Sequence, residues 1–268
     1  MTSVRAPLVS SLAPKVVPKV VALATVFGSW QALVWSGWKE QYVLPAPATV
    51  LKALGKLATT SVFWSAVGTT LRRALVGYGV AVVIGSFIAV TVVRSTWMRS
   101  AVGALITGLQ TMPSIAWFPL AIVLFKLSEQ AISFVIVLGA APSIANGVIS
   151  GVDHIPPLWL RAAHTMDARG VSLWRHVIAP AALPSVIGGL KQGWAFAWRS
   201  LMAGELIVII ANRPSLGAKL QFAREFSDAP GLLALMIVIL ILGIAADSAF
   251  AAVDLRVRAR RGLLITTS

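Results

Sequence analysis

The sequence predicts an all-α, polytopic membrane protein, and three observations support that prediction. Of the 268 residues, 57% are hydrophobic and only 12% are charged, whereas soluble domains carry roughly 25% charged residues. The mean hydropathy is +0.84, so polar side chains are too few to cover a water-facing surface. Apolar runs long enough for one membrane crossing recur along the chain, and its length accommodates about six of them. Soluble enzymes, fibrous proteins and disordered chains are excluded.

The first apolar run extends from Val20 to about Trp38, after a polar segment at residues 1–19 that contains three prolines. An A-x-A triplet, Ala22 to Ala24, opens this run, whereas a signal-peptide cleavage site would close it. We therefore expect a retained first membrane helix behind a short N-terminal segment.

An amphipathic segment follows the stiff turn at residues 44–47, where each proline disfavours helix for the residue before it. Residues 49–70 show helical spacing with moderate hydrophobicity, and Lys52 and Lys56 lie away from the apolar side. That pattern is typical of a helix in the membrane interface. We expect an interfacial helix here and not a crossing.

Five longer apolar runs complete the six expected membrane helices. Pro113 and Pro119 interrupt the second of these runs. Neither an internal repeat nor a long linker divides them, so we expect one transmembrane domain over residues 20–255 and a basic tail at 256–268. The five runs are residues 74–93, 102–125, 131–149, 183–210 and 232–253.

The basic residues predict the orientation, because cytoplasmic loops are enriched in Lys and Arg. A modest excess of them places both termini in the cytoplasm, and Arg72 and Arg73 on the outer side fit this arrangement least. The net charge of +14 would suggest nucleic acid only in a soluble chain. We therefore expect the lipid bilayer, and no nucleic acid, as a partner.

One polar loop stands out between the fourth and fifth expected helices, at residues 151–184. Two segments with helical spacing, 158–169 and 171–178, are separated in it by a glycine. The small side chains of Ala162 and Ala163 would let another surface approach closely. From the residues alone, this helix-turn-helix either presents an apolar ridge to a partner or lies on the membrane surface.

The loop resembles the cytoplasmic coupling loop of permease subunits in binding-protein-dependent ABC importers, whose pattern is E-A-A-x3-G-x9-I-x-L-P. Aligned without a gap, the two alanines fall on Ala162 and Ala163 and the proline falls on Pro180. The glutamate is replaced by Arg161 and the glycine by Asp167, and the leucine is also replaced. Further stretches are similar to the sulfonate/nitrate/taurine group of this family and occur in its order. They are residues 44–47, 70–77, 112–120, 168–184 and 198–205.

The resemblance implies a type I ABC importer permease fold in the bacterial cytoplasmic membrane, with six membrane helices and a coupling helix between the fourth and fifth. Two cytoplasmic ABC ATPase subunits, an extracytoplasmic solute-binding protein and a second copy of the permease are the implied partners. The ATPases would bind ATP and Mg²⁺, because the P-loop pattern G-x4-G-K-[ST] is absent from this sequence. The implied docking residues are Arg161, Ala162, Ala163, Thr165, Met166, Asp167, Arg169, Gly170 and Pro180.

Arg199 is the strongest candidate for a substrate pathway, because a charge inside a crossing needs a partner or a water-filled cavity. It would lie ~12 Å deeper than Lys191 at 1.5 Å per residue, on the same helix face as Gln192. A guanidinium pairs through two hydrogen bonds with sulfonate, nitrate or carboxylate. The alternative is a structural role, in which Arg199 pairs with a backbone carbonyl or with Asp247.

Several other polar residues lie within the expected crossings. We expect Glu205 to hold a loop or gate and Asn146 to form an interhelical hydrogen bond. Gln110 and Ser114 flank Pro113, and this segment either lines the pathway or is merely a kink in the helix. With no cysteine, and no histidine at metal-ligand spacing, the sequence predicts neither a metal site nor a catalytic group. The candidate pathway residues are Gln110, Ser114, Gln192, Arg199 and Glu205.

The sequence thus predicts a non-enzymatic transport subunit that moves an aliphatic sulfonate or taurine by alternating access, driven by a partner ATPase. Within the same family, nitrate, bicarbonate or another small solute is the alternative cargo. A passive channel is the alternative of another class, and it would not need a cytoplasmic coupling loop.

Overall fold

The computed structural model describes residues 13–260, which form α-helices and no β-strand. This confirms the all-α prediction. Most of the predicted N-terminal segment and residues 261–268 of the predicted basic tail lie outside the described residues. The elements are α1 (Ala13–Trp35), α2 (Pro47–Ala58), α3 (Ser61–Val93), α4 (Thr96–Thr111), the 3-10 turn η1 (Ser114–Trp117), α5 (Phe118–Phe125), α6 (Glu129–Asp153), α7 (Pro157–Thr165), α8 (Gly170–Leu173), the π-helical turn η2 (Trp174–Ile178), α9 (Ala179–Ile207), α10 (Leu216–Glu225) and α11 (Ala229–Arg260).

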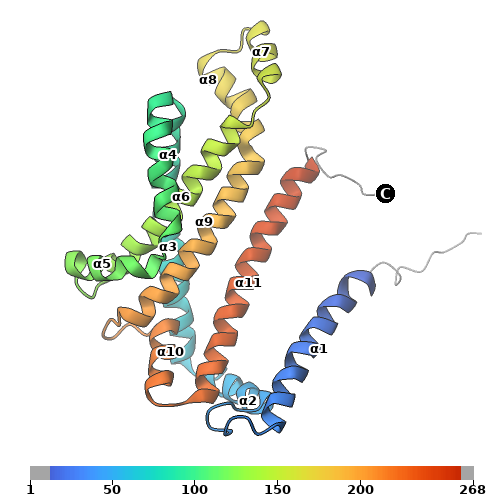
Figure 1. The fold of residues 1–268 in the computed structure, drawn as a ribbon, viewed down its shortest axis with the longest axis vertical. Coiled ribbons are helices and arrows are strands. Elements are labelled where there is room, and N and C mark those ends of the chain that lie inside the picture. The colour runs from blue at the N-terminus through green and yellow to red at the C-terminus, as the bar shows by residue number, and fades with distance from the viewer. Residues whose placement is uncertain (1–12, 261–268) are drawn as a thin grey trace, which may run out of the picture.

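The helix α6 lies at the centre of the bundle, with α3 packed on one side of it and α9 running along another (Figure 1). Small residues bring these helices together. A Cβ atom added at Gly189 of α9 would lie 2.6 Å from the Cα atom of Gly147 in α6, and one added at Gly77 of α3 would lie 2.9 Å from Ile136. Backbones can approach this closely only where a side chain is missing.

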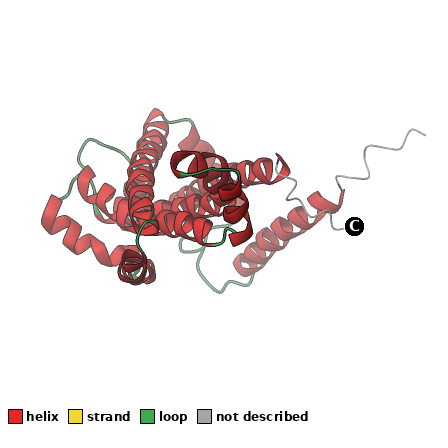
Figure 2. Cartoon of the chain, turned by 90° about the horizontal axis from the view of Figure 1, so that it is seen from above, coloured by secondary structure: helices red, strands yellow, loops and turns green. Residues whose placement is uncertain are grey.

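The two ends of the bundle differ in what they carry (Figure 1). One end holds α7 and α8, and we name it the α7–α8 end. The opposite end holds α2 and α10, and we name it the α2–α10 end. The first described residues of α1 and the last of α11 point toward the α7–α8 end. Figure 2, which looks along the bundle, shows α1 lying beside the other helices.

Three helices, α3, α6 and α11, are long and apolar enough to cross a membrane. A fourth candidate is the pair formed by α4 and η1–α5, which is bent by 101°. The apolar part of α1, Val20–Trp35, is shorter, and α9 has 29 residues but carries three ionisable side chains. The predicted count of six crossings therefore requires α1 and α9 in addition to these four.

The predicted crossing at residues 102–125 is not one straight helix, because the chain turns sharply between α4 and η1, at the first of the two prolines that interrupt the run. Met112 ends α4 in an extended conformation, with φ −76° and ψ 129°. Proline disfavours helix for the residue before it and has no N–H to continue the helical ladder. Pro113 therefore breaks the helix here instead of kinking it.

The predicted interfacial helix at residues 49–70 is wrong after residue 58. The helix α2 ends at Ala58, and residues 61–70 form the first turns of the 33-residue α3. The hydroxyl groups of Thr59 and Thr60 donate to the carbonyl oxygens of Lys56 and Leu57, each at 2.8 Å. Side-chain hydroxyls that bond to the last carbonyls compete with helix continuation, which explains a break without glycine or proline.

Candidate functional site

The helices α6 and α9 share one open face on the side away from α3. The hydroxyl of Tyr78 in α3 donates to the carbonyl oxygen of Leu190 in α9 at 2.9 Å, which marks the side of α9 that faces α3. At 100° per residue, Gln192 and Arg199 project from the opposite side of α9, and both are exposed. Asn146 of α6 is exposed on the same side. The sequence prediction that Gln192 and Arg199 share a face is confirmed.

Arg199 lies level with the middle of α6. Its neighbour Ser200 lies against Gly139, where an added Cβ atom would come within 2.6 Å of the serine oxygen. Gly139 is ~15 Å from one end of α6 and ~21 Å from the other at 1.5 Å per residue. Gln192 lies closer to the α7–α8 end, because the adjacent Gly193 packs against Ile144.

The guanidinium of Arg199 has no carboxylate partner within residues 13–260. It stacks over the ring of Phe196, with 5.2 Å between its Cζ atom and the ring centroid. Asp247, the acidic residue considered as its partner, instead pairs with Lys191 at 3.0 Å. The open face therefore carries a cation level with the middle of α6, and no carboxylate of the described residues compensates its charge.

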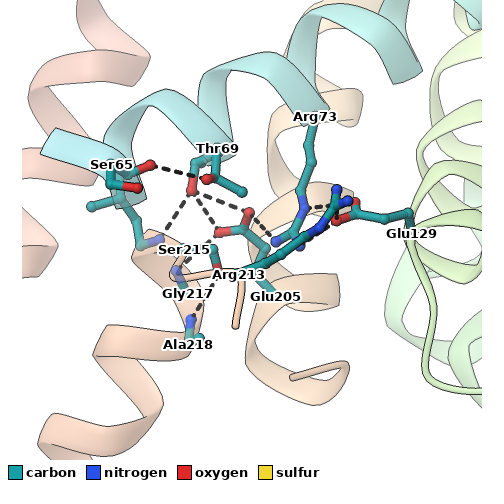
Figure 3. A network of polar contacts seen from close by, with 11 residues as sticks. Ser65, Thr69, Arg73, Glu129, Glu205, Arg213, Ser215, Gly217 and Ala218 are labelled. Atoms are coloured by element: carbon teal, nitrogen blue, oxygen red, sulfur yellow. Dashed lines mark hydrogen bonds and ion pairs between the residues drawn. The ribbon is translucent and has the colours of Figure 1, made fainter. Parts of the chain in front are cut away.

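A buried ion-pair network occupies the α2–α10 end (Figure 3). The carboxylate of Glu205 is fully buried and accepts from the Thr70 hydroxyl at 2.8 Å, from Arg73 Nη1 at 2.9 Å and from the Gly217 N–H at 3.0 Å. Buried charges are stable only when they are paired and hydrogen-bonded. Glu205, a candidate pathway residue that we expected to hold a loop, lies inside this network and contacts α10.

The network extends from Arg73 to the start of α6. The Nε and Nη2 atoms of Arg73 donate to the two carboxylate oxygens of Glu129, each at 2.8 Å, and Arg213 lies 3.4 Å from the same group. The contacts join α3, α6, α9 and the segment before α10. Arg72 and Arg73 were the basic residues that fitted the predicted orientation least. The network explains them, because the charge of Arg73 is neutralised here while Arg72 is exposed.

The remaining polar candidates lie between α4 and α6. The amide nitrogen of Gln110 donates to the Ser143 hydroxyl at 3.2 Å, which joins the two helices. Ser114 begins η1 immediately after the bend and is half-buried. Among the described contacts, the Asn146 side chain has no hydrogen-bond partner, so the interhelical bond predicted for it is not found.

The predicted helix-turn-helix forms at the α7–α8 end. Asp167 follows α7 with a φ of +54°. Its N–H donates to the carbonyl of His164, and the next N–H, of Ala168, donates to Ala163, both at 3.0 Å. This is a Schellman motif, which requires a left-handed residue after the helix. Aspartate adopts that conformation more readily than most residues, so the replacement of the family's glycine preserves the turn.

An open groove lies between α7 and the start of α9, about 570 Å³ in volume. Ala163 is buried against it and Ala162 is exposed. Met166 is 82% exposed, and the apolar side chains of Leu158 and Val171 in the same segment are exposed too. Two of the predicted docking residues, Arg161 and Arg169, are exposed in the same segment. The lining residues are Trp159, Ala162, Ala163, Met166, His176, Val177, Pro180 and Ala181.

Comparisons with known proteins agree with this arrangement. The protein family described as "Binding-protein-dependent transport system inner membrane component" matches residues 81–259. The chain is 28% identical to a putative aliphatic sulfonates transport permease protein, SsuC, of Escherichia coli K12, over 81% of this chain and 82% of that protein.

Two further relatives carry different substrates in their names. The nitrate import permease protein NrtB of Synechocystis is 26% identical over 75% of this chain and 76% of its own length. The riboflavin transport system permease protein RibX of Chloroflexus aurantiacus is 29% identical over 80% and 78%. Among solved structures, an inward-facing MetNI methionine ABC transporter has a similar fold, with a TM-score of 0.57 and 20% identity over 72% of this chain and 93% of that one.

Proposed function

The chain belongs to the family of binding-protein-dependent transport system inner membrane components and to its sulfonate/nitrate/taurine group of ABC importer permeases, and we propose that it carries an aliphatic sulfonate or taurine. It is a multi-pass protein of the inner membrane and a transport subunit. The cargo and the partner subunits in the following paragraphs are our proposals.

The uncompensated Arg199 is the observation that supports an anionic cargo. An arginine at the centre of a membrane helix costs roughly 2.5–3.5 kcal/mol unless it is paired or hydrated. Arg199 is exposed on the open face of α6 and α9, so a second copy of the chain would enclose it in a water-filled cavity. A sulfonate passing through that cavity would accept two hydrogen bonds from the guanidinium.

We keep four of the pathway residues predicted from the sequence in the proposed pathway, Arg199 among them. Gln192 lies on the exposed side of α9, and Gln110 and Ser114 lie at the bend between α4 and η1. Glu205 has a different role in the proposal, because its carboxylate is already satisfied by three partners. It holds the α2–α10 end together.

Transport would be driven from the α7–α8 end. Two cytoplasmic ATPase subunits, which bind ATP and Mg²⁺, would dock on the groove beside α7 and move the membrane helices between inward-open and outward-open states. In this orientation both termini are cytoplasmic, and a solute-binding protein delivers the cargo to the α2–α10 end. The docking residues are Arg161, Ala162, Ala163, Thr165, Met166, Asp167, Arg169, Gly170 and Pro180.

Uptake by the reconstituted complex tests the proposal. The complex of permease, ATPase and solute-binding protein in liposomes should import labelled taurine or an alkanesulfonate only with ATP, and the cargo should stimulate ATP hydrolysis. Competition by nitrate, bicarbonate and riboflavin ranks the alternatives. Import of riboflavin but of no anion would overturn the anionic cargo, and flux without ATP would indicate a passive channel.

A further inference from the structure

The open face of α6 and α9 carries a second polar position, closer to the α7–α8 end than Arg199. We propose that the side-chain amides of Asn146 and Gln192, on either side of Gly188, form a second binding position for the oxygen atoms of the transported anion. The inference rests on the proposed function, because it gives the anion released by Arg199 its next contact.

Asn146 and Gln192 lie close in sequence to the point where α6 and α9 approach each other most tightly. That approach occurs at Gly147 and Gly189, where an added Cβ atom at Gly189 would lie 2.6 Å from the Cα atom of Gly147. Asn146 and Gly188 each precede one of these glycines and are both exposed. Gln192 lies one helical turn from Gly188 on the same side of α9.

Open space lies in front of Gly188. A Cβ atom added there would meet no atom of the chain within 4 Å, in contrast to the crowded Gly189 beside it. The space adjoins the backbone of α9, and Asn146 and Gln192 are exposed on the same face of the two helices. A side chain at position 188 would enter this space, and its Cβ atom would displace nothing in the described chain.

The chemistry of the two amides suits an anion in transit. Each –NH₂ group offers two hydrogen-bond donors, and sulfonate or nitrate oxygens accept them. Neutral donors bind an anion less strongly than a guanidinium does. Conduction requires binding that is favourable enough for entry and weak enough for release. An amide position after Arg199 would therefore receive the anion and release it again without trapping it.

The competing interpretation is that the second copy covers Asn146 in a dry contact, where its amide bonds across the interface. The two interpretations differ in whether water and anions reach this position. The chain contains no cysteine, so a single introduced thiol reports on access directly.

The first experiment blocks the space in front of Gly188. We expect Gly188→Trp to assemble into the complex but to lose most of its sulfonate uptake. Gly79→Trp is the matched control, because Gly79 is an exposed glycine of α3 with the same open surroundings, and it should retain uptake. Wild-type uptake by an assembled Gly188→Trp complex would overturn the inference.

The second experiment needs no bulky substitution. An Asn146→Cys thiol in the reconstituted complex should react with a negatively charged methanethiosulfonate reagent, and taurine or an alkanesulfonate should slow the reaction. A thiol that does not react would indicate a dry contact and would overturn the inference. Arg199→Ala distinguishes failure of this inference from failure of the proposed function. If Arg199→Ala loses uptake but Gly188→Trp transports normally, only the second binding position is rejected. If Arg199→Ala transports normally, the proposed pathway itself is rejected.

Discussion

The carboxylate of Glu205 and the guanidinium of Arg73 lie 2.9 Å apart in the interior of the α2–α10 end, with 0% and 5% of their side chains exposed. The pair joins α9 to α3 across a separation of 132 residues in the sequence. Because Thr70 and Glu129 complete the hydrogen bonds of the pair, neither charge is left unsatisfied. This end of the bundle therefore combines a satisfied polar network with a buried apolar cluster that includes Phe63, Leu216 and Leu235.

Removing one partner of this pair should destabilise the folded protein. Breaking a buried ion pair costs about 3–5 kcal/mol because the remaining charge is left uncompensated. We expect Glu205→Ala to lower the thermal unfolding midpoint of the detergent-purified protein strongly. Arg72→Ala, which removes the exposed neighbouring charge, should change it little. Equal effects of the two variants would contradict the role of the network.

Replacing Arg199 should impair transport without disturbing assembly. Loss of a hydrogen-bonded charge contact with the anion is worth about 1.5–3 kcal/mol, which corresponds to about a tenfold to hundredfold lower uptake. Arg199→Lys should retain part of the activity, since an ammonium lacks the planar paired donors. Uptake is normalised to purified intact complex, with Arg256→Ala as the exposed-charge control. If Arg199 is structural, the alanine variant will assemble poorly but transport normally per assembled complex.

A charge in the groove beside α7 should uncouple ATP hydrolysis from transport. Ala162 is exposed and lines the groove, so Ala162→Glu leaves the chain's own packing intact while blocking the close approach of the ATPase. We expect weaker co-purification with the ATPase and loss of cargo-stimulated hydrolysis. Ala259→Glu places the same charge on an exposed position of α11 and should have neither effect. Normal coupling in Ala162→Glu would reject the groove as the docking site.

The left-handed turn at the end of α7 also predicts how substitutions of Asp167 behave. Glycine adopts the left-handed conformation freely, so Asp167→Gly should preserve the turn and the uptake. A β-branched residue is strained there, and the left-handed conformation costs roughly 1–2 kcal/mol for an ordinary residue. Asp167→Val should therefore increase proteolysis of the loop. Equal protease resistance of the two variants would show that the turn does not depend on this conformation.

The sequence predicted the apolar helices and the helix-turn-helix between α6 and α9 because each is encoded locally. Hydrophobic runs identified α3, α6 and α11, and the small-residue pair with its spacing identified α7. The bend after α4 was visible only as a proline, whose outcome depends on what surrounds it. The end of α2 was missed because two threonine hydroxyls replace the usual glycine or proline signal.

The contacts of the candidate site could not be predicted in the same way. The Glu205–Arg73 pair joins distant segments, and the sequence offers several acids and bases that could be combined. The exposure of Asn146 and the open space at Gly188 follow from the crossing of α6 and α9 at two glycines. That crossing is a property of packing and is not indicated by either helix alone.

The orientation of the bundle yields the last prediction. The loop containing Asp167 and the end of α11 lie toward the α7–α8 end, whereas the turn between α10 and α11 lies at the opposite end (Figure 1). Ser227, in that turn, is exposed. Because cytoplasmic segments are enriched in basic residues, we expect the α7–α8 end, with its exposed arginines, inside the cell.

Single cysteines placed in this cysteine-free chain measure that orientation in intact cells. A membrane-impermeant thiol reagent should label Ser227→Cys at once. It should label Asp167→Cys and Ala259→Cys only after the membrane is permeabilised, because both positions would face the cytoplasm. The permeabilised sample is the control for thiol reactivity at each site. Labelling of Asp167→Cys in intact cells would invert the topology and would place the coupling loop where no cytoplasmic ATPase could reach it.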